Sequence, residues 1–323
     1  MKGFDKKWTD FPDYILGITH EIWEGRNIAS LHDYYTEDIP VRSPGSVIKG
    51  NKAVIAATMA TLAEFPDRRL LGEDVIWSGT PEKGMLSSHR ILSTATHLGD
   101  GVYGAASGKT VGYRVIGDCH AINNQINDEW LVRDQGAIVR QLGWDPKTYA
   151  ASRIDREGGP KNCIKPFTPE TDIKGPYMGR GNDDKWGAVY ADILGRIMQA
   201  DLTVIPDQYD RACQLELPGG VTGHGHDDAD RFWMGLRASF PDAKFTIEHQ
   251  IGREDKMKSP RAAIRWGLYG SHSGQGGSFG VPTGAMVYIM GICHAEFGPR
   301  GIHREFVVFD ETAIWKQILM HTG

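Results

Sequence analysis

Cysteine is scarce in this sequence, with four residues among 323, and no two of them are spaced as Cys-x-x-Cys. So few thiols cannot build the disulfide framework of a small secreted protein, and they predict no thiolate zinc site. Cys119 and Cys293 lie inside apolar runs, where a buried thiol behaves as a small hydrophobic side chain. The sequence also has no Walker motif and no Gly-x-Gly-x-x-Gly at a strand–helix junction, so nothing in it predicts nucleotide binding.

Long apolar runs and an excess of one charge are lacking as well. Lys and Arg number 36 against 41 Asp and Glu, which gives a formal net charge of −5, and no block of like charge occurs. We therefore expect no nucleic-acid partner. No apolar run reaches the roughly 18 residues of a membrane span, and residues 1–16 lack the apolar segment of a signal peptide. These features predict a cytoplasmic protein that binds a small-molecule substrate and no membrane.

The sequence does contain a long internal repeat. Gly117-Asp118-Cys119-His120-Ala121 recurs 174 residues later as Gly291-Ile292-Cys293-His294-Ala295, and Phe65-Pro66-Asp67 recurs as Phe240-Pro241-Asp242. This period is far longer than the roughly 20–50 residues of solenoid repeats, so each copy should be a whole domain. We expect a first domain at 1–145 and a second at 185–323. Residues 146–184 are rich in Pro and Gly and predict an extended strap between them.

Each copy has the pattern of an α+β domain. In the first copy, apolar residues at helical spacing predict a helix that begins near Tyr14, and a second helix at 52–64 ends before a proline. Strands are then expected at 70–77, 86–97, 109–122 and 127–139, and their counterparts at 244–252, 261–272, 285–297 and 302–309. Helices followed by antiparallel strands predict helices packed on one side of a curled sheet. The concave face of that sheet must be filled or form a pocket.

The order of these features resembles the SnoaL-like polyketide cyclases of the NTF2-like superfamily. The second copy carries Gly-Ser-His-Ser-Gly at 270–274 and Pro282-Thr283-Gly284, where the first has Ala106-Ser107-Gly108. The resemblance covers both copies and not the strap. It implies two tandem cone-shaped α+β barrels, each with a deep cavity, and chemistry without a metal or an organic cofactor. It also implies that the two copies pair as an intramolecular pseudo-dimer, and a further homodimer of the whole chain stays open.

The resemblance also implies a set of catalytic residues. In these cyclases an Asp late in the sheet acts as general acid/base in an aldol ring closure, helped by a His on a neighbouring strand. By position these are Asp134 and His120 in the first copy and Asp310 and His294 in the second. The Asp follows the His by 14 residues in the first copy and by 16 in the second. Burial would raise the pKa of such an Asp and suit it to act as a base, whereas an Asp in a turn commonly bonds backbone amides.

Further candidates lie on the neighbouring strands of both copies. His97 and His272 repeat within Arg-x6-His-x-Gly and are candidate catalytic residues. The candidate substrate-binding residues are Arg265, Tyr269, Tyr288, Glu296, Arg90 and Tyr113. An Arg that faces the cavity could hold a carboxylate or an enolate oxygen, and one that faces outward would form a surface ion pair. Because the second copy carries seven of the twelve histidines, we expect it to be the active copy.

These residues predict a cofactor-independent acid/base enzyme that acts on a hydrophobic, aromatic or polyketide-like molecule, as an aldol-type cyclase or isomerase. The same acid/base pair run backwards would be a retro-aldol lyase or a dehydratase. A zinc-dependent hydrolase is an alternative, since His224-x-His226 places two imidazoles on one face and His272, His294 or Glu296 could join them. Asp227 and Asp228 beside them favour a helix N-cap at this place. A non-catalytic ligand-binding protein is a third alternative.

Overall fold

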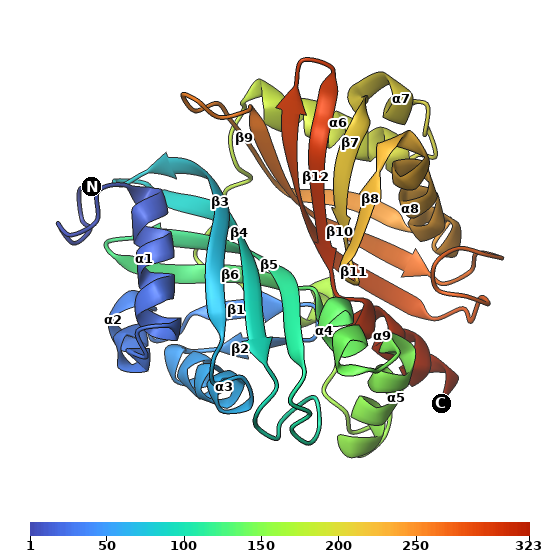
Figure 1. Ribbon diagram of the computed structural model, residues 1–323, viewed down its shortest axis with the longest axis horizontal. Helices are drawn as coiled ribbons and strands as arrows, with labels where there is room; N and C mark the ends of the chain where they lie inside the picture. The colour runs from blue at the N-terminus through green and yellow to red at the C-terminus, as the bar shows by residue number, and fades with distance from the viewer. The chain divides into compact units, whose positions relative to one another are not determined.

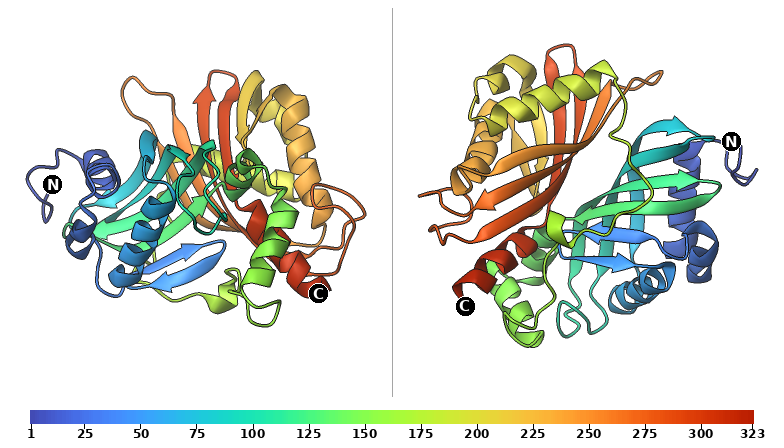
Figure 2. Two further views of the ribbon diagram at one scale, coloured as in Figure 1. Left: turned by 60° about the horizontal axis from the view of Figure 1, so that its bottom comes forward. Right: turned by 180° about the vertical axis from the view of Figure 1, so that it is seen from behind.

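The computed structural model describes residues 1–323 and contains two compact units (Figures 1 and 2). The first unit comprises residues 1–144 and 167–179, and the second comprises 145–166 and 180–323. Each unit has one six-stranded mixed sheet, with the order β2-β1-β6-β5-β4-β3 in the first and β8-β7-β12-β11-β10-β9 in the second. The two orders are the same, so the chain consists of two tandem α+β domains. None of the helices is long and apolar enough to cross a membrane.

The helices of the first unit cover one face of its sheet (Figure 1). The elements are α1 (Phe11–Trp23), η1 (Ile28–Ser30), α2 (Leu31–Tyr34), β1 (Pro40–Ser43), β2 (Ser46–Lys49), α3 (Asn51–Glu64), β3 (Arg69–Thr80), β4 (Gly84–Thr96), β5 (Thr110–Ile122), β6 (Gln125–Arg133), α4 (Gln135–Leu142) and η2 (Pro169–Thr171). The side chain of Asp10 caps α1 by accepting from the backbone N of Asp13 at 2.8 Å. The buried face of α1 repeats at helical spacing through Tyr14, Ile18 and Ile22 and packs into the core of this unit.

The second unit has the corresponding elements and one added helix, α5. Its elements are α5 (Pro146–Arg156), α6 (Lys185–Met198), α7 (Val204–Gln208), β7 (Tyr209–Leu217), β8 (Val221–His224), α8 (Gly225–Ser239), β9 (Lys244–Arg253), β10 (Arg261–Ser271), β11 (Met286–Gly298), β12 (Gly301–Phe309) and α9 (Glu311–Thr322). The core between α6, α8 and the sheet contains Trp233 and Trp266, which are fully buried. Two indoles in one core fill a large volume.

The end of the last strand in the first unit differs from the expectation. A strand was expected to reach Val139, but β6 ends at Arg133 and residues 135–142 form α4. Asp134 caps this helix, and Ile138, Val139 and Leu142 are buried. The apolar residues of this stretch therefore repeat at the spacing of a helix. The Pro- and Gly-rich stretch at 40–50, for which the sequence patterns predicted no strand, forms the hairpin of β1 and β2.

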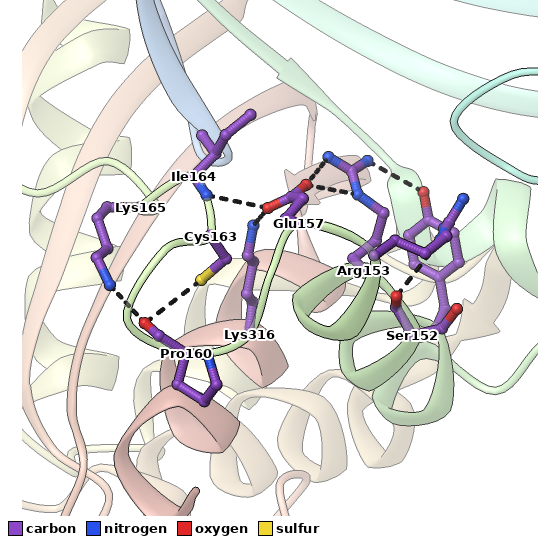
Figure 3. A network of polar contacts seen from close by, with 10 residues as sticks. Ser152, Arg153, Glu157, Pro160, Cys163, Ile164, Lys165 and Lys316 are labelled. Atoms are coloured by element: carbon purple, nitrogen blue, oxygen red, sulfur yellow. Dashed lines mark hydrogen bonds and ion pairs between the residues drawn. The ribbon is translucent and has the colours of Figure 1, made fainter.

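Part of the expected strap is a helix. Asp145 accepts hydrogen bonds from the backbone N of Lys147 and Thr148, and a proline follows at the first helical position, which together start α5. This helix lies beside α9 in every view (Figures 1 and 2). Figure 3 shows how the end of α5 is held: Glu157 accepts from the Nζ of Lys316 at 2.5 Å and from the backbone N of Ile164 at 3.0 Å. Residues 145–166 thus pack with the second unit, and 167–179 pack with the first.

The sheet register separates the two repeated histidines. On β5, His120 pairs with Leu86, whereas His294 on β11 pairs with Ala263. Leu86 corresponds to Arg261 in the repeat, and Arg261 pairs with Glu296. His120 therefore corresponds to Glu296 in the sheet. The repeated Cys-His-Ala motif matches His120 with His294 instead, which lies two residues before Glu296. This shift accounts for the unequal spacing between His and Asp in the two copies.

Candidate active site

The first unit contains a buried cavity of about 150 Å³ between its helices and its sheet. Apolar side chains of α1, α3 and β4 to β6 form most of the lining. A cavity of this size accommodates about one aromatic ring. Three threonines also line it, and so do the titratable side chains of Tyr35, Arg68, His89, Glu129 and Arg133. An apolar cavity with a few converging polar groups is the usual form of a small-molecule site.

Strand alternation determines which residues reach this cavity. Glu129 pairs with Cys119 on β5, and Cys119 pairs with Ser87 on β4, so the three side chains form one row across the sheet. The next row on the same face contains His89 and Leu131. Two residues further along β6, Arg133 points to this face as well.

Glu129 is the carboxylate of the cavity. It is 6% exposed, and burial raises its pKa from 4.5 to about 7, although a hydrogen bond from Tyr35 favours the charged form. The pKa of Tyr35 is raised well above 10 by burial and by the Glu129 charge, so its hydroxyl stays protonated. A carboxyl group with a pKa near neutrality is matched to general base work at physiological pH.

His89 lies on the same face of the sheet as Glu129, in the next row and two strands away. Burial lowers the pKa of its imidazole to about 4, so the ring is neutral near pH 7. A Cβ atom at Gly117 would lie 2.9 Å from the Cε1 of His89 and 3.1 Å from its Nε2. Glycine at this position therefore lets the ring lie flat over β5 and reach toward β6. The Nδ1 of His89 lies 3.2 Å from the hydroxyl of Ser87.

Two arginines form the other end of the cavity. Arg68 is 4% exposed, and its guanidinium lies over the ring of Trp23, with 4.3 Å to the ring centroid. Its Nε donates to the hydroxyl of Ser93 at 3.0 Å. Burial lowers the pKa of Arg68 to about 10. The nearby Tyr113 has a pKa below 10, because the charges of Arg68 and Arg133 outweigh the effect of burial.

The second unit repeats the carboxylate but fills the space around it. Glu305 pairs with Ala295, which pairs with Ala262, and this row matches the row of Glu129. Burial raises the pKa of Glu305 to about 7, and the hydroxyls of Tyr190 and Tyr209 donate to it at 2.8 and 2.9 Å. The remaining polar positions are apolar here: the counterparts of His89, Arg68 and Arg133 are Ile264, Ala243 and Phe309.

A single indole occupies much of the corresponding volume. The ring of Trp266 lies so close to Gly291 that a Cβ atom there would come within 2.1 Å of it. Its Nε1 donates to the Sγ of Cys293 at 2.9 Å, and Phe309 lies beside it with ring centroids 6.4 Å apart. In the first unit, the positions of Trp266 and Gly291 hold Ile91 and Val115, which line the cavity.

The aspartates expected to be catalytic cap helices in this structure. Asp134 accepts from the backbone N of Ala137 at 2.9 Å at the start of α4. Asp310 accepts from the backbone N of Thr312 at 2.8 Å at the start of α9. This geometry corresponds to the backbone-bonding alternative, and Asp134 does not line the cavity.

The histidines expected to be catalytic are buried outside the cavity lining. His97 lies with its Nε2 3.3 Å from a carboxylate oxygen of Glu64, and its Nδ1 lies 3.0 Å from the hydroxyl of Ser107. His272 has its Nδ1 3.1 Å from the hydroxyl of Thr283, and burial lowers its pKa. The Nδ1 of His120 lies 2.7 Å from the side-chain oxygen of Asn127. His294 is buried on β11 at a position that pairs with Ala263 and Phe306.

The expected substrate-binding residues lie mainly on the other face of each sheet. Arg90 donates to Glu73 at 3.0 Å, and Arg265 alternates with the core residues Ile264 and Trp266 on β10. Tyr269 and Tyr288 contact each other edge to face at 5.8 Å, and Glu296 lies 3.6 Å from Arg304. Only Tyr113 in this set faces the interior of its unit, where it adjoins Arg68 and Arg133.

The histidines considered as zinc ligands are not brought together. The Nε2 of His226 lies 2.9 Å from the backbone oxygen of Tyr209, while His224 is exposed and donates its backbone N to Asp228 at 2.8 Å. No three His, Cys, Asp or Glu side chains of the chain form a group that could hold a metal ion. Asp228 bonds the residue before α8, as expected for a residue of a helix N-terminus.

Sequence reasoning missed the polar residues that line the cavity. Glu129 and Glu305 carry a usable signal, because each is a carboxylate inside an apolar strand and both copies have it. His89 carries a weaker signal for a site residue, because it is a single histidine that follows Ser87 and Ser88 in a strand. Arg68 and Tyr35 come from connecting segments, and only the folded chain brings them to the sheet.

Comparison with known proteins finds one matching family and several distantly similar solved structures. Residues 14–142 match the family described as SnoaL-like polyketide cyclase. Similar solved structures include IdmH from Streptomyces antibioticus (18% identity, 41% of this chain, 98% of that chain, TM-score 0.36) and TsrD from Streptomyces laurentii (17%, 41%, 93%, 0.35). Another is a SnoaL-like polyketide cyclase from Agrobacterium tumefaciens (19% identity, 41% of this chain, 97% of that chain, TM-score 0.34). No curated protein matches the chain. The first unit therefore carries the match to the SnoaL-like polyketide cyclase family, and the second unit repeats the strand order of its sheet.

Proposed function

We propose that the first unit is a cofactor-independent enzyme that removes a proton from the carbon next to a carbonyl group of a small, hydrophobic, aromatic substrate. The observation that carries this proposal is the position of Glu129, a carboxyl with a pKa of about 7 inside an apolar cavity of about 150 Å³. A base with a pKa near the ambient pH is partly ionised and still binds a proton well, which is the best compromise for proton transfer.

Tyr35 and His89 have distinct roles in this proposal. Tyr35 donates to Glu129 and so orients the carboxylate toward the cavity. His89 donates to the substrate carbonyl as a neutral imidazole. The hydroxyl proton of Ser87 has two acceptors in reach, and Nδ1 of His89 at 3.2 Å is nearer than the backbone oxygen of Cys119 at 3.4 Å. When Ser87 donates to Nδ1, the proton of the ring is on Nε2 and available to the substrate.

The chemistry follows from these positions. Glu129 takes the proton, the electron pair moves into the carbonyl, and the resulting enolate oxygen is stabilised by the N–H of His89. The enolate carbon can then attack a second carbonyl of the same molecule, and the oxygen of that carbonyl takes up the proton from Glu129, which closes a ring in an aldol reaction and restores the base. The same base serves a retro-aldol cleavage or an isomerisation. The match of residues 14–142 to the SnoaL-like polyketide cyclases supports the cyclase direction.

The second unit has a structural role in this proposal. Its carboxylate is bound by two tyrosine hydroxyls, and Trp266 and Phe309 lie where the first unit keeps space. We therefore place the activity in the first unit, although the larger number of histidines in the second had predicted the opposite.

Exchange of carbon-bound protons tests the proposal without knowledge of the natural substrate. The full chain is incubated in D₂O with a panel of aryl ketones and aryl β-keto esters, and loss of the α-proton signal is followed by NMR. Glu129→Gln should slow the exchange by about 10²–10⁴-fold, the usual contribution of a general base. Glu305→Gln is the matched control in the other unit and should exchange at the wild-type rate. Equal rates in the wild type and Glu129→Gln would refute the proposal.

A further inference from the structure

The arginine end of the cavity has no role in the proton transfer described above. Arg68 and Arg133 both line the cavity, and neither forms an ion pair with a carboxylate of the chain. The charges that act on Arg68 are those of Tyr113, Arg133 and Tyr103, and the Arg133 charge opposes that of Arg68. Two like charges at one end of an apolar cavity are costly unless an anion joins them.

Unused hydrogen-bond donors lie at the same place. The Nη1 of Arg68 and the Nε of Arg133 are buried and have no hydrogen-bond partner. Arg68 itself is held firmly, since it lies over the ring of Trp23 and its Nε is bonded to Ser93. Its free Nη1 is therefore a preorganised donor. A buried donor without a partner costs about 1–3 kcal/mol, which a ligand that accepts the hydrogen bond would recover.

We propose that Arg68 and Arg133 form a carboxylate subsite, so that the substrate is an aromatic acid with its carboxylate at this end and its enolisable carbon at Glu129. The position of the reacting carbon rests on the proposed function, while the anion subsite rests on the arginines alone. Guanidinium groups match the planar shape of a carboxylate and bind it through paired hydrogen bonds. Tyr113 adjoins both arginines and keeps this end polar.

The length of the cavity fits this class of substrate. Glu129 and Arg133 are four residues apart on one face of β6, so their Cα atoms are separated by about 13 Å at 3.3 Å per residue. Both side chains extend into the space between, where one aromatic ring can lie with its carboxylate at the arginines and its other substituent at Glu129. A dianion would bring a second negative charge toward Glu129, and for this reason we favour a carboxylate over a phosphate.

Arg68 also connects the cavity to an outer polar pocket. Arg26 and Arg69 line that pocket together with Arg68, and so do Glu24 and Asp67. Both acids are already engaged by the backbone: Glu24 accepts from the N of Leu70 at 2.9 Å, and Asp67 accepts from the N of Thr96 at 2.7 Å. The outer pocket therefore offers a path by which an anion could reach Arg68.

Binding of benzoate tests the subsite. Its affinity for the full chain is measured by calorimetry at pH 7 and low salt, beside benzamide as a neutral analogue of the same shape and phenyl phosphate as a dianion. We expect benzoate to bind at least tenfold more tightly than benzamide and more tightly than phenyl phosphate. Arg133→Met and Arg68→Met should each reduce the preference for benzoate to less than threefold and leave benzamide unchanged.

Arg69→Met is the matched control, since Arg69 lines only the outer pocket. It should keep the benzoate preference, and a loss equal to that of Arg133→Met would overturn the assignment to the inner cavity. Circular dichroism checks that each variant is folded, and Arg133→Met decides the matter should Arg68→Met unfold. Equal binding of benzoate and benzamide by the wild type, or tighter binding of phenyl phosphate, would also overturn the proposal.

Glu129→Gln separates this inference from the proposed function. This variant should bind benzoate at least as tightly as the wild type while its proton exchange is lost. Unchanged exchange with a clear benzoate preference would refute the base and keep the carboxylate subsite. Lost exchange without any benzoate preference would refute the subsite and keep the base.

Discussion

Glu129 and Glu305 occupy the same position in the two sheets, and burial raises the pKa of both to about 7. The side chains around the two carboxyl groups differ. Glu129 lines a cavity with His89 and two arginines, whereas Glu305 is enclosed by tyrosine hydroxyls and large apolar side chains. The duplicated carboxylate thus faces a cavity in one unit and is part of a packed core in the other. The following predictions test this difference.

The rate of proton exchange should depend on the ionisation of Glu129. A base acts in its ionised form, so kcat/KM should rise with pH and level off above about 7, the pKa of Glu129. His89, with a pKa of about 4, should add no second step between pH 5 and 8. A pH profile of exchange in D₂O checks this. A rate that falls above pH 7 would mean that protonated Glu129 acts as an acid.

Replacing His89 should affect both activity and stability. His89→Ile introduces the residue of the second unit at this position and removes the donor to the enolate oxygen, so the exchange rate should fall by about 10²–10³-fold. The folded pKa of His89 is lowered, so its contribution to stability is present above the unfolded pKa of about 6.5 and is lost as pH falls toward 4. The variant should lose less stability between pH 6.5 and 4 than the wild type, as measured by urea unfolding. An unchanged exchange rate would remove His89 from the mechanism.

Transferring the indole of the second unit should close the cavity. In Ile91→Trp combined with Val115→Gly, the new ring can lie over the new glycine as Trp266 lies over Gly291. We expect a folded protein that neither exchanges substrate protons nor binds benzoate. The converse change, Trp266→Ala, should lower the free energy of unfolding by about 3–5 kcal/mol and leave the chemistry of the first unit intact. Thermal unfolding and the exchange assay together distinguish the two variants.

Glu305 should make the stability of the chain depend on pH. Its folded pKa of about 7 lies above the ordinary 4.5, so its contribution to stability is complete below about pH 4.5 and is lost as pH rises through 7. The full loss corresponds to at most about 3 kcal/mol. Glu305→Gln still accepts from Tyr190 and Tyr209 and cannot ionise, so its free energy of unfolding should change less between pH 5 and 8 than that of the wild type. Identical pH dependence in the two proteins would show that Glu305 does not titrate in this range.

Arg42 should hold the segment at 167–179 against the first unit. It is 2% exposed and binds both Asp128 and Asp172, the latter at 2.5 Å, and it also donates to the backbone oxygen of Ile173. Arg42→Met leaves Asp128 buried without its partner and should cost about 3–5 kcal/mol. Trypsin should then cut at Lys174 faster than in the wild type. Asp172→Asn keeps the pair of Arg42 with Asp128 and should have a smaller effect on both measurements.

Several local features could be predicted from the sequence because they depend on neighbours along the chain. The helices α1 and α3, the long strands β3 to β5 and the proline that follows α3 all have recognisable spacing. Residues 135–139 of α4 were assigned to a strand because their apolar run is short, and a short run is compatible with the periodicity of a helix and with that of a strand. The hairpin of β1 and β2 was missed because its strands are four residues each and rich in turn formers.

The residues of the proposed site could be predicted less well, because they come from distant parts of the chain. The Asp residues expected from the family pattern cap helices, the His residues are buried, and His120 and His294 differ in register by two positions. Repetition in sequence does not reveal a register shift, since that depends on the loop lengths and on the pairing of the strands. Counting histidines also favoured the second unit, because the count says nothing about the space around them.

The sequence by itself determined the duplication, the α+β class and the likeness to the SnoaL-like cyclases, because repeated spacing and strand alternation are written along the chain. Only the tertiary structure decided that the first copy has a cavity beside its buried carboxylate. In the first unit Ile91 pairs with Val115 and leaves space, whereas in the second unit the ring of Trp266 lies over Gly291 and fills it. Arg68 and Tyr35 also reach the sheet of the first unit from connecting segments. Volume and charge inside a core are properties of residues brought together by folding, and no single segment carries them.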